Sequence, residues 1–115
     1  MILSVMSAAL PGVAQVPGII NYQGRFLVNS TNYNGTCQFK FALVNGVGDA
    51  SYWSHDGTSV GGSEPTGTTI SLPVNGGLFS VNLGDAAVPN MISPIPLSVF
   101  ANSQVFLRIW VYDPA

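Results

Sequence analysis

Hydrophobicity with a period of two residues is the feature that most constrains the fold of this chain. In residues 19–28, apolar side chains occupy one row of alternate positions, with Gly24 in the same row, and the polar residues Asn21, Gln23 and Arg25 occupy the other. The apolar residues of this row are Ile20, Tyr22, Phe26 and Val28. Successive side chains of an extended chain point to opposite faces, so the pattern predicts a half-buried β-strand. We expect these four residues to carry strand pairing within or between subunits.

Other short segments have the same strand character. Residues 37–44 and 78–83 alternate between apolar and polar positions, whereas residues 105–112 are apolar on both faces except at Arg108. A strand that is apolar on both faces is either central in its sheet or covered on its second side. Shorter strands are predicted in residues 50–55 and 69–74, and a single helical turn in residues 96–101 with Leu97, Val99 and Phe100 packing inward.

Glycine and asparagine separate these strands. The Asn-Gly pair within residues 29–36 and the triplet Asn75-Gly76-Gly77 are typical hairpin turns, so each predicts a hairpin between its flanking strands. Residues 56–68 have no apolar period and form a long loop, a kind of segment that often carries function. The fold class that follows is all-β: an antiparallel, jelly-roll-like β-sandwich of six to eight short strands.

The N-terminal residues have a different character. Residues 1–14 combine an apolar run, a Pro-Gly break and small residues at Gly12 and Ala14, as in the second half of a secretory signal peptide. Cleavage after Ala14 would leave residues 15–115 as a single secreted or cell-surface β-sandwich module, a suitable size for one core. No basic residue precedes Arg25, so the basic start of a signal peptide is missing. The alternative is an ordinary apolar strand or helix.

Charge narrows the range of partners. Only 7% of the residues are charged, against about 25% in typical soluble domains. The net charge is −2 and the three basic residues are far apart in sequence, which disfavours nucleic acid. No apolar run approaches 18 residues, so we expect no membrane insertion of the mature domain. An uncharged polar surface favours association with further copies or with other surface proteins.

The segment around Tyr52, Trp53, His55 and Asp56 is the most suggestive of a ligand site. With one histidine in the chain, acid–base or nucleophilic catalysis would have to use His55. We instead expect Ser51, Trp53 and His55 to share one strand face, with His55 and Asp56 ending the strand in a solvated turn. The two aromatic residues could stack on a sugar ring, although packing in the core is the commoner role of such side chains.

Metal and cofactor chemistry have little support in the sequence. The loop aspartates Asp49, Asp56, Asp85 and Asp113 are far apart and lack the spacing of a calcium-binding loop. Cys37 lies in an apolar row and is expected to be a buried thiol. We therefore predict no catalytic residues, no metal site and no cofactor.

The segment Pro-Gly-Ile-Ile-Asn-Tyr-Gln-Gly-Arg-Phe-Leu-Val at residues 17–28 resembles the start of an N-terminal β-module in secreted bacterial proteins. These proteins, mostly of unknown role, begin with Asn-Tyr-Gln-Gly-Arg just after a signal peptide; some are labelled tail-fibre-like or carry an intramolecular-chaperone domain. Further similar pieces lie at residues 39–43, 52–53, 77–85 and 107–110. The resemblance implies that the module continues beyond residue 115, and it brings no catalytic motif.

Three functions are consistent with these observations. The first is a non-enzymatic structural or adhesive module at the cell surface. The second is an extracellular filament subunit that donates a strand, either residues 16–28 or the N-terminal apolar run, into a neighbour. The third is a carbohydrate-binding module that uses Tyr52 and Trp53.

Overall fold

The computed structural model describes the backbone of residues 2–9 and 18–113 and the side chains of residues 18–112. Within these residues the chain is all-β apart from one 3₁₀ turn, η1 (Leu97–Ala101). The strands are β1 (Ile2–Ala9), β2 (Ile20–Arg25), β3 (Leu27–Val28), β4 (Thr31–Asn32), β5 (Gly35–Val44), β6 (Ser51–Ser54), β7 (Ile70–Val74), β8 (Leu78–Leu83) and β9 (Phe106–Asp113). All six strand segments predicted from the sequence contain a strand: β2, β5, β6, β7, β8 and β9. β1 and the two-residue strands β3 and β4 bring the total among the described residues to nine.

The larger sheet is built around β5. Its strand order is β1-β9-β5-β6, and β7 also pairs with β5. One edge of β5 pairs antiparallel with β9, as in Phe41↔Ile109. The opposite edge pairs with β7 near the start of β5 and with β6 near its end. β5 and β9 are therefore the two interior strands of this sheet.

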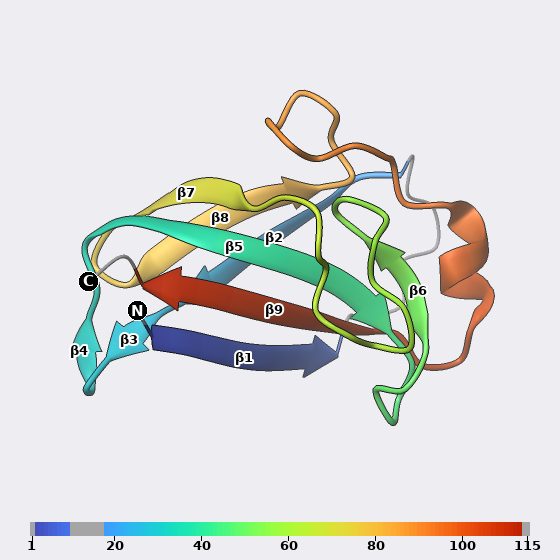
Figure 1. Cartoon of the computed structure of the whole chain (residues 1–115), viewed down its shortest axis with the longest axis horizontal. Helices are drawn as coiled ribbons and strands as arrows, with labels where there is room; N and C mark the ends of the chain where they lie inside the picture. The colour runs from blue at the N-terminus through green and yellow to red at the C-terminus, as the bar shows by residue number, and fades with distance from the viewer. Residues whose placement is uncertain (1, 10–17, 114–115) are drawn as a thin grey trace.

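The smaller sheet consists of β2 and β8, paired antiparallel from Ile20↔Leu83 to Arg25↔Leu78. It lies behind β5 and β9 (Figure 1). The rings of Phe39 on β5 and Phe79 on β8 are 4.6 Å apart and join the two layers. The predicted antiparallel β-sandwich is confirmed.

The core between the layers follows the predicted alternation. On β5 it receives Cys37, Phe39, Phe41 and Leu43, all fully buried. On β8 it receives Phe79, Val81 and Leu83, whereas Ser80 and Asn82 are exposed. Ile20 and Tyr22 of β2 are half-buried against this core, and Phe26 is buried within it. The apolar row that we expected to pair strands thus lines the interior of its own chain.

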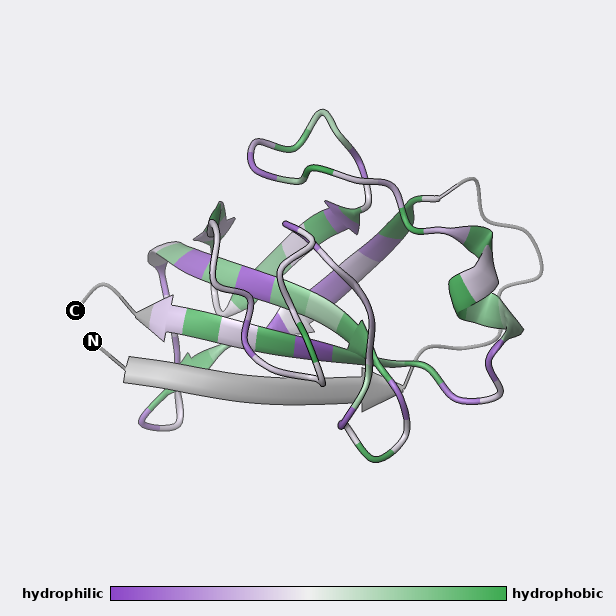
Figure 2. Ribbon diagram, turned by 45° about the vertical axis from the view of Figure 1, so that its right-hand side comes forward, coloured by the Kyte–Doolittle hydropathy of each residue, from purple (hydrophilic) through white to green (hydrophobic). Residues whose placement is uncertain are grey.

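The interior strands also bury side chains on their second face. Ala42, Val44 and Trp110 form a separate buried cluster there, with Phe106 and Tyr112 packed beside it. Alternating hydrophilic and hydrophobic bands run along β5 and β9 (Figure 2). The prediction for residues 105–112 is therefore confirmed in both of its forms, since β9 is interior and is also covered.

The first predicted hairpin is wrong in position. The tight turn lies at Asn29-Ser30, where both residues have positive φ (52° and 65°), and it joins only the short strands β3 and β4. Positive φ at both central residues gives the turn a twist that matches paired strands. The backbone N–H of Phe26 donates to the carbonyl of Gly77 at 2.6 Å, at the point where β2 ends. β2 therefore pairs with β8 and not with β5.

The second predicted turn forms, but its flanking strands separate. Gly76 and Gly77 have φ of 59° and 82°, and Leu78 N–H donates to the carbonyl of Asn75 at 3.0 Å. β7 then pairs with β5 in the larger sheet, while β8 pairs with β2 in the smaller one. The turn is a corner between the two layers.

The 3₁₀ turn η1 and the N-terminal residues give two further outcomes. In η1, Val99 is buried as predicted, but Leu97 is 66% exposed, because a five-residue turn at the surface directs only part of its side chains inward. Residues 2–9, expected to belong to a signal peptide, form β1 and pair with β9. The expected cleavage position after residue 14 lies outside the described residues.

A prediction follows from the close contact of β2 with β8. A Cβ built on Gly24 would lie 2.7 Å from Cζ of Phe79, inside contact distance. Gly24→Ala should therefore lower the free energy of unfolding by about 1–3 kcal/mol through overpacking. Urea denaturation would measure the change.

The matched control uses Phe79→Leu, which removes the ring atoms that the added methyl group would meet. In that background Gly24→Ala should lower the free energy of unfolding much less, because residues in contact have coupled effects on stability. If the two substitutions change the free energy of unfolding additively, this account of the contact between Gly24 and Phe79 is contradicted.

Candidate functional site

The predicted ligand residues lie at the end of β6, where a β-bulge alters the expected faces. Trp53 lies opposite Leu43 on the core side, but the register shifts between Leu43 and Val44, so Ser51 lies opposite Val44. Residues directly opposite each other on paired strands share a face. Ser51 is therefore on the outer face and Trp53 on the core face, which corrects the prediction that they share one.

His55 and Asp56 are buried, with 0% and 6% of their surface exposed. The prediction that they end the strand in a solvated turn is wrong. The backbone N–H of His55 donates to the carbonyl of Phe41 at 3.0 Å, which holds the residue against β5. The residues that follow then fold back over both side chains.

Both ring nitrogens of His55 are bonded to backbone groups. Nε2 lies 2.7 Å from the carbonyl oxygen of Thr68, and Nδ1 lies 3.2 Å from the backbone nitrogen of Phe41. A carbonyl only accepts hydrogen bonds, so Nε2 carries the proton and Nδ1 accepts the N–H of Phe41. This neutral tautomer ties the end of the 56–68 loop to β5 and uses both nitrogens that acid–base catalysis would need.

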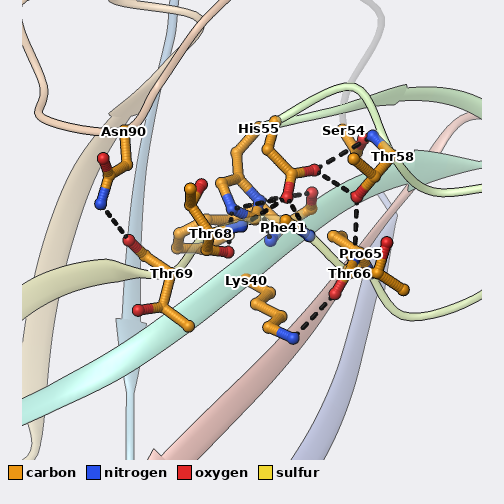
Figure 3. Close-up of polar contacts among 12 residues, drawn as sticks. Lys40, Phe41, Ser54, His55, Thr58, Pro65, Thr66, Thr68, Thr69 and Asn90 are labelled. Atoms are coloured by element: carbon orange, nitrogen blue, oxygen red, sulfur yellow. Dashed lines mark hydrogen bonds and ion pairs between the residues drawn. The ribbon is translucent and has the colours of Figure 1, made fainter.

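The carboxylate of Asp56 accepts four hydrogen bonds from the two ends of the 56–68 loop. Oδ1 accepts the backbone N–H and the hydroxyl of Thr58, at 3.1 and 2.7 Å. Oδ2 accepts the backbone N–H groups of Gly67 and Thr68, at 3.0 and 2.9 Å. The Thr58 hydroxyl also accepts the N–H of Thr66, and Figure 3 shows Thr58 and Thr66 side by side.

These bonds determine the charge state of Asp56. Burial by itself would raise the pKa of the carboxyl, but the hydrogen bonds from Thr68 and Thr58 favour the ionised form. Their combined effect lowers the pKa below its usual value. Asp56 is therefore a buried carboxylate whose charge is satisfied by fixed donors.

The middle of the loop is fastened to the outer face of β5 and β9. Lys40 Nζ lies 2.9 Å from a carboxylate oxygen of Glu64. It also donates to the carbonyl of Pro65 at 2.7 Å (Figure 3). The Tyr112 hydroxyl donates to the same oxygen of Glu64. Arg108 donates to the carbonyl of Gly62 at 2.9 Å. The loop is thus a cover for the second face of the interior strands.

The two aromatic residues have different environments. Trp53 is only 7% exposed, packs in the core, and donates its indole N–H to the carbonyl of Ser93 at 3.2 Å. Tyr52 is half-buried. Both line a small recess of about 240 Å³ whose other walls include Ser51, Ser54 and Ser59. His55 and Asp56 do not line it, so the four predicted residues do not form one pocket, and sugar stacking would depend on Tyr52.

A larger open groove of about 810 Å³ lies elsewhere, where the end of β7 meets β2 and β8. Its lining includes Gln23, Arg25, Pro73 and Leu78, the last of which is 55% exposed. The sequence patterns do not predict this groove. The available signal was an apolar residue, Leu78, at an outward position of its strand.

Between residues 18 and 112, no three His, Cys, Asp or Glu side chains lie close enough together to hold a metal ion. Among the described helical segments, none has the length and hydrophobicity needed to cross a bilayer.

Comparison with known proteins identifies the family. Residues 21–115 match the family described as a domain of unknown function, DUF8740. The chain belongs to this family. No curated protein and no solved structure matches the chain. The DUF8740 match includes every described strand except β1, which precedes it in sequence. It begins one residue after Ile20, the first residue of β2.

A prediction tests the carboxylate at the centre of the 56–68 loop. Asp56→Asn should lower the free energy of unfolding near neutral pH by about 1–3 kcal/mol, because the amide cannot accept all four hydrogen bonds. Because the pKa of Asp56 is lowered in the folded protein, the stabilisation that its carboxylate provides is complete above the ordinary aspartate pKa of about 3.9. This stabilisation is lost as the pH falls through the pKa of Asp56 in the folded protein. The difference between wild type and variant should therefore shrink in acid.

Asp85→Asn is the matched control, since Asp85 accepts one backbone N–H, from Ala87 at 2.9 Å, in a more exposed turn. Urea denaturation of the three proteins from pH 7 to pH 3 gives the comparison. Equal effects of the two substitutions, or a difference at Asp56 that is independent of pH, would contradict the proposed role.

Proposed function

We propose that this protein is a non-enzymatic structural or adhesive β-module that acts outside the cell or at its surface. The observation that carries the proposal is that the polar groups of His55 and Asp56 are fully hydrogen-bonded to the protein's own backbone and loop. The one histidine has both ring nitrogens bonded to backbone groups, and the adjacent carboxylate is occupied by four loop donors. The side chains best suited to catalysis therefore act as structural supports.

The surface supports the same proposal. Of the few charged residues, Lys40, Glu64 and Arg108 are engaged in fastening the 56–68 loop. Asp49 is bonded to Asn45 within its own turn, at 2.6 Å. With so little free charge, repulsion between copies is weak, and contact with other copies or with other surface proteins is favoured. Glycans remain a further partner class, through Tyr52.

A filament subunit that assembles by strand donation is the second candidate. It is favoured by the position of β1, which completes one side of the larger sheet from outside the family match. A strand added at a sheet edge contributes main-chain hydrogen bonds, the basis of strand-donation assembly.

Export in a secretion-competent bacterium tests the main proposal. The full chain should appear outside the cytoplasm with residue 15 as its new N-terminus, as measured by fractionation and mass spectrometry. Ala14→Leu should block processing, because signal cleavage requires a small residue before the cut, whereas Ala9→Leu should not.

Retention of the wild-type chain in the cytoplasm, with residues 1–14 still attached, would contradict the proposed location. Turnover of substrates by the purified chain that is abolished by His55→Gln, in a variant that still folds, would contradict the non-enzymatic role.

A further inference from the structure

β1 forms one edge of the larger sheet and pairs with a single strand. Its eight residues are in antiparallel register with β9, from Ile2↔Asp113 to Ala9↔Phe106. Among the described strands, β1 has no other pairing partner. Figure 1 shows it along the side of β9 away from β5. Its attachment to the fold therefore depends on this one ladder.

β9 requires a partner at that edge. The strand is interior and apolar on both faces, with Leu107, Ile109 and Val111 fully buried on the core side and Trp110 buried on the other. Without β1, it would present unpaired backbone groups along a long apolar edge, the kind of edge that pairs with another chain. The family match includes β9 and excludes β1. The strand that pairs with this edge of β9 therefore lies outside the matched domain.

The length of the connection between β1 and β2 limits how far β1 can reach. Residues 10–19 separate β1 from β2. Ten residues span at most about 33–36 Å when extended. A strand on such a connection can pair with β9 of an adjacent copy and make the same hydrogen bonds.

We propose that β1 is an exchangeable strand, and that Ile2–Ala9 of one copy pairs with Phe106–Asp113 of a second copy in the register seen within one chain. Reciprocal exchange would give closed dimers, whereas donation from each copy to the next would give open filaments. Because the ladder is the same within and between chains, protein concentration decides which form dominates. The inference rests on the strand-donation function proposed above, in which residues 1–14 stay attached, and names its donor, its acceptor and its partner, a second copy of this chain.

Disulfide trapping in the full chain tests the inference. Ser4 and Val111 are paired in register, and directly opposed residues of an antiparallel pair have Cα atoms about 4.5–5.5 Å apart, suitable for a disulfide. Two variants, Ser4→Cys and Val111→Cys, are made in a Cys37→Ala background, which removes the natural buried thiol. They are mixed at increasing concentration and oxidised, and mass spectrometry counts the mixed dimer.

The control replaces Val111→Cys with Ile109→Cys, which lies on the same face but two positions out of register. We expect about tenfold more mixed dimer from the in-register pair, increasing with concentration, because a disulfide requires close Cβ atoms. Equal yields from both pairs would overturn the proposal.

A single chain that carries both Ser4→Cys and Val111→Cys separates the remaining outcomes. Closure within each chain, with no mixed dimer from the separate variants, would show that β1 is a permanent strand and would overturn exchange. Failure to close would overturn the β1–β9 ladder itself. The export test separates the two proposals, because cleavage after Ala14 removes β1. A processed, secreted module would overturn strand exchange and leave the structural function in place.

Discussion

The rest of the structure depends on one constraint: the paired strands β5 and β9 bury side chains on both faces. One face contributes Phe39, Phe41 and their neighbours to the core between the sheets, and the other buries Trp110 with Ala42 and Val44. Two covers are therefore required. The sheet of β2 and β8 provides the first, and the 56–68 loop, which contains no strand, provides the second.

A loop can act as a cover only if its backbone groups find partners. The carboxylate of Asp56 satisfies donors at both ends of the 56–68 loop, His55 fixes the carbonyl of Thr68, and Lys40 and Arg108 hold its middle. Burying a carboxylate is unfavourable unless fixed donors replace water, and here four do so. In the function proposed above, a weakly charged surface and the sheet edges are the means of association.

Local patterns predicted the strands well, because the alternation of side chains is a property of each segment alone. The inward rows of β5 and β8 were read correctly on that basis. Pairing between strands was not, because it depends on distant contacts: Phe26 bonds to Gly77, and β2 joins β8. The burial of His55 and Asp56 was missed for the same reason, since their partners lie on β5 and at the far end of the 56–68 loop. Apart from Thr58, these partners lie 11 to 14 residues away in sequence, too far for a local alternation pattern to report.

Amide hydrogen exchange of the 56–68 loop tests the central claim most directly. The N–H groups of Thr58, Gly67 and Thr68 lie outside any strand yet donate to a buried carboxylate. Exchange requires these bonds to open, so these amides should be protected at a level close to that of β5 amides and far above that of the exposed turn at residues 45–49. Exchange at the rate of that turn would contradict the account, because it would mean that the cover over β5 and β9 opens independently of the fold.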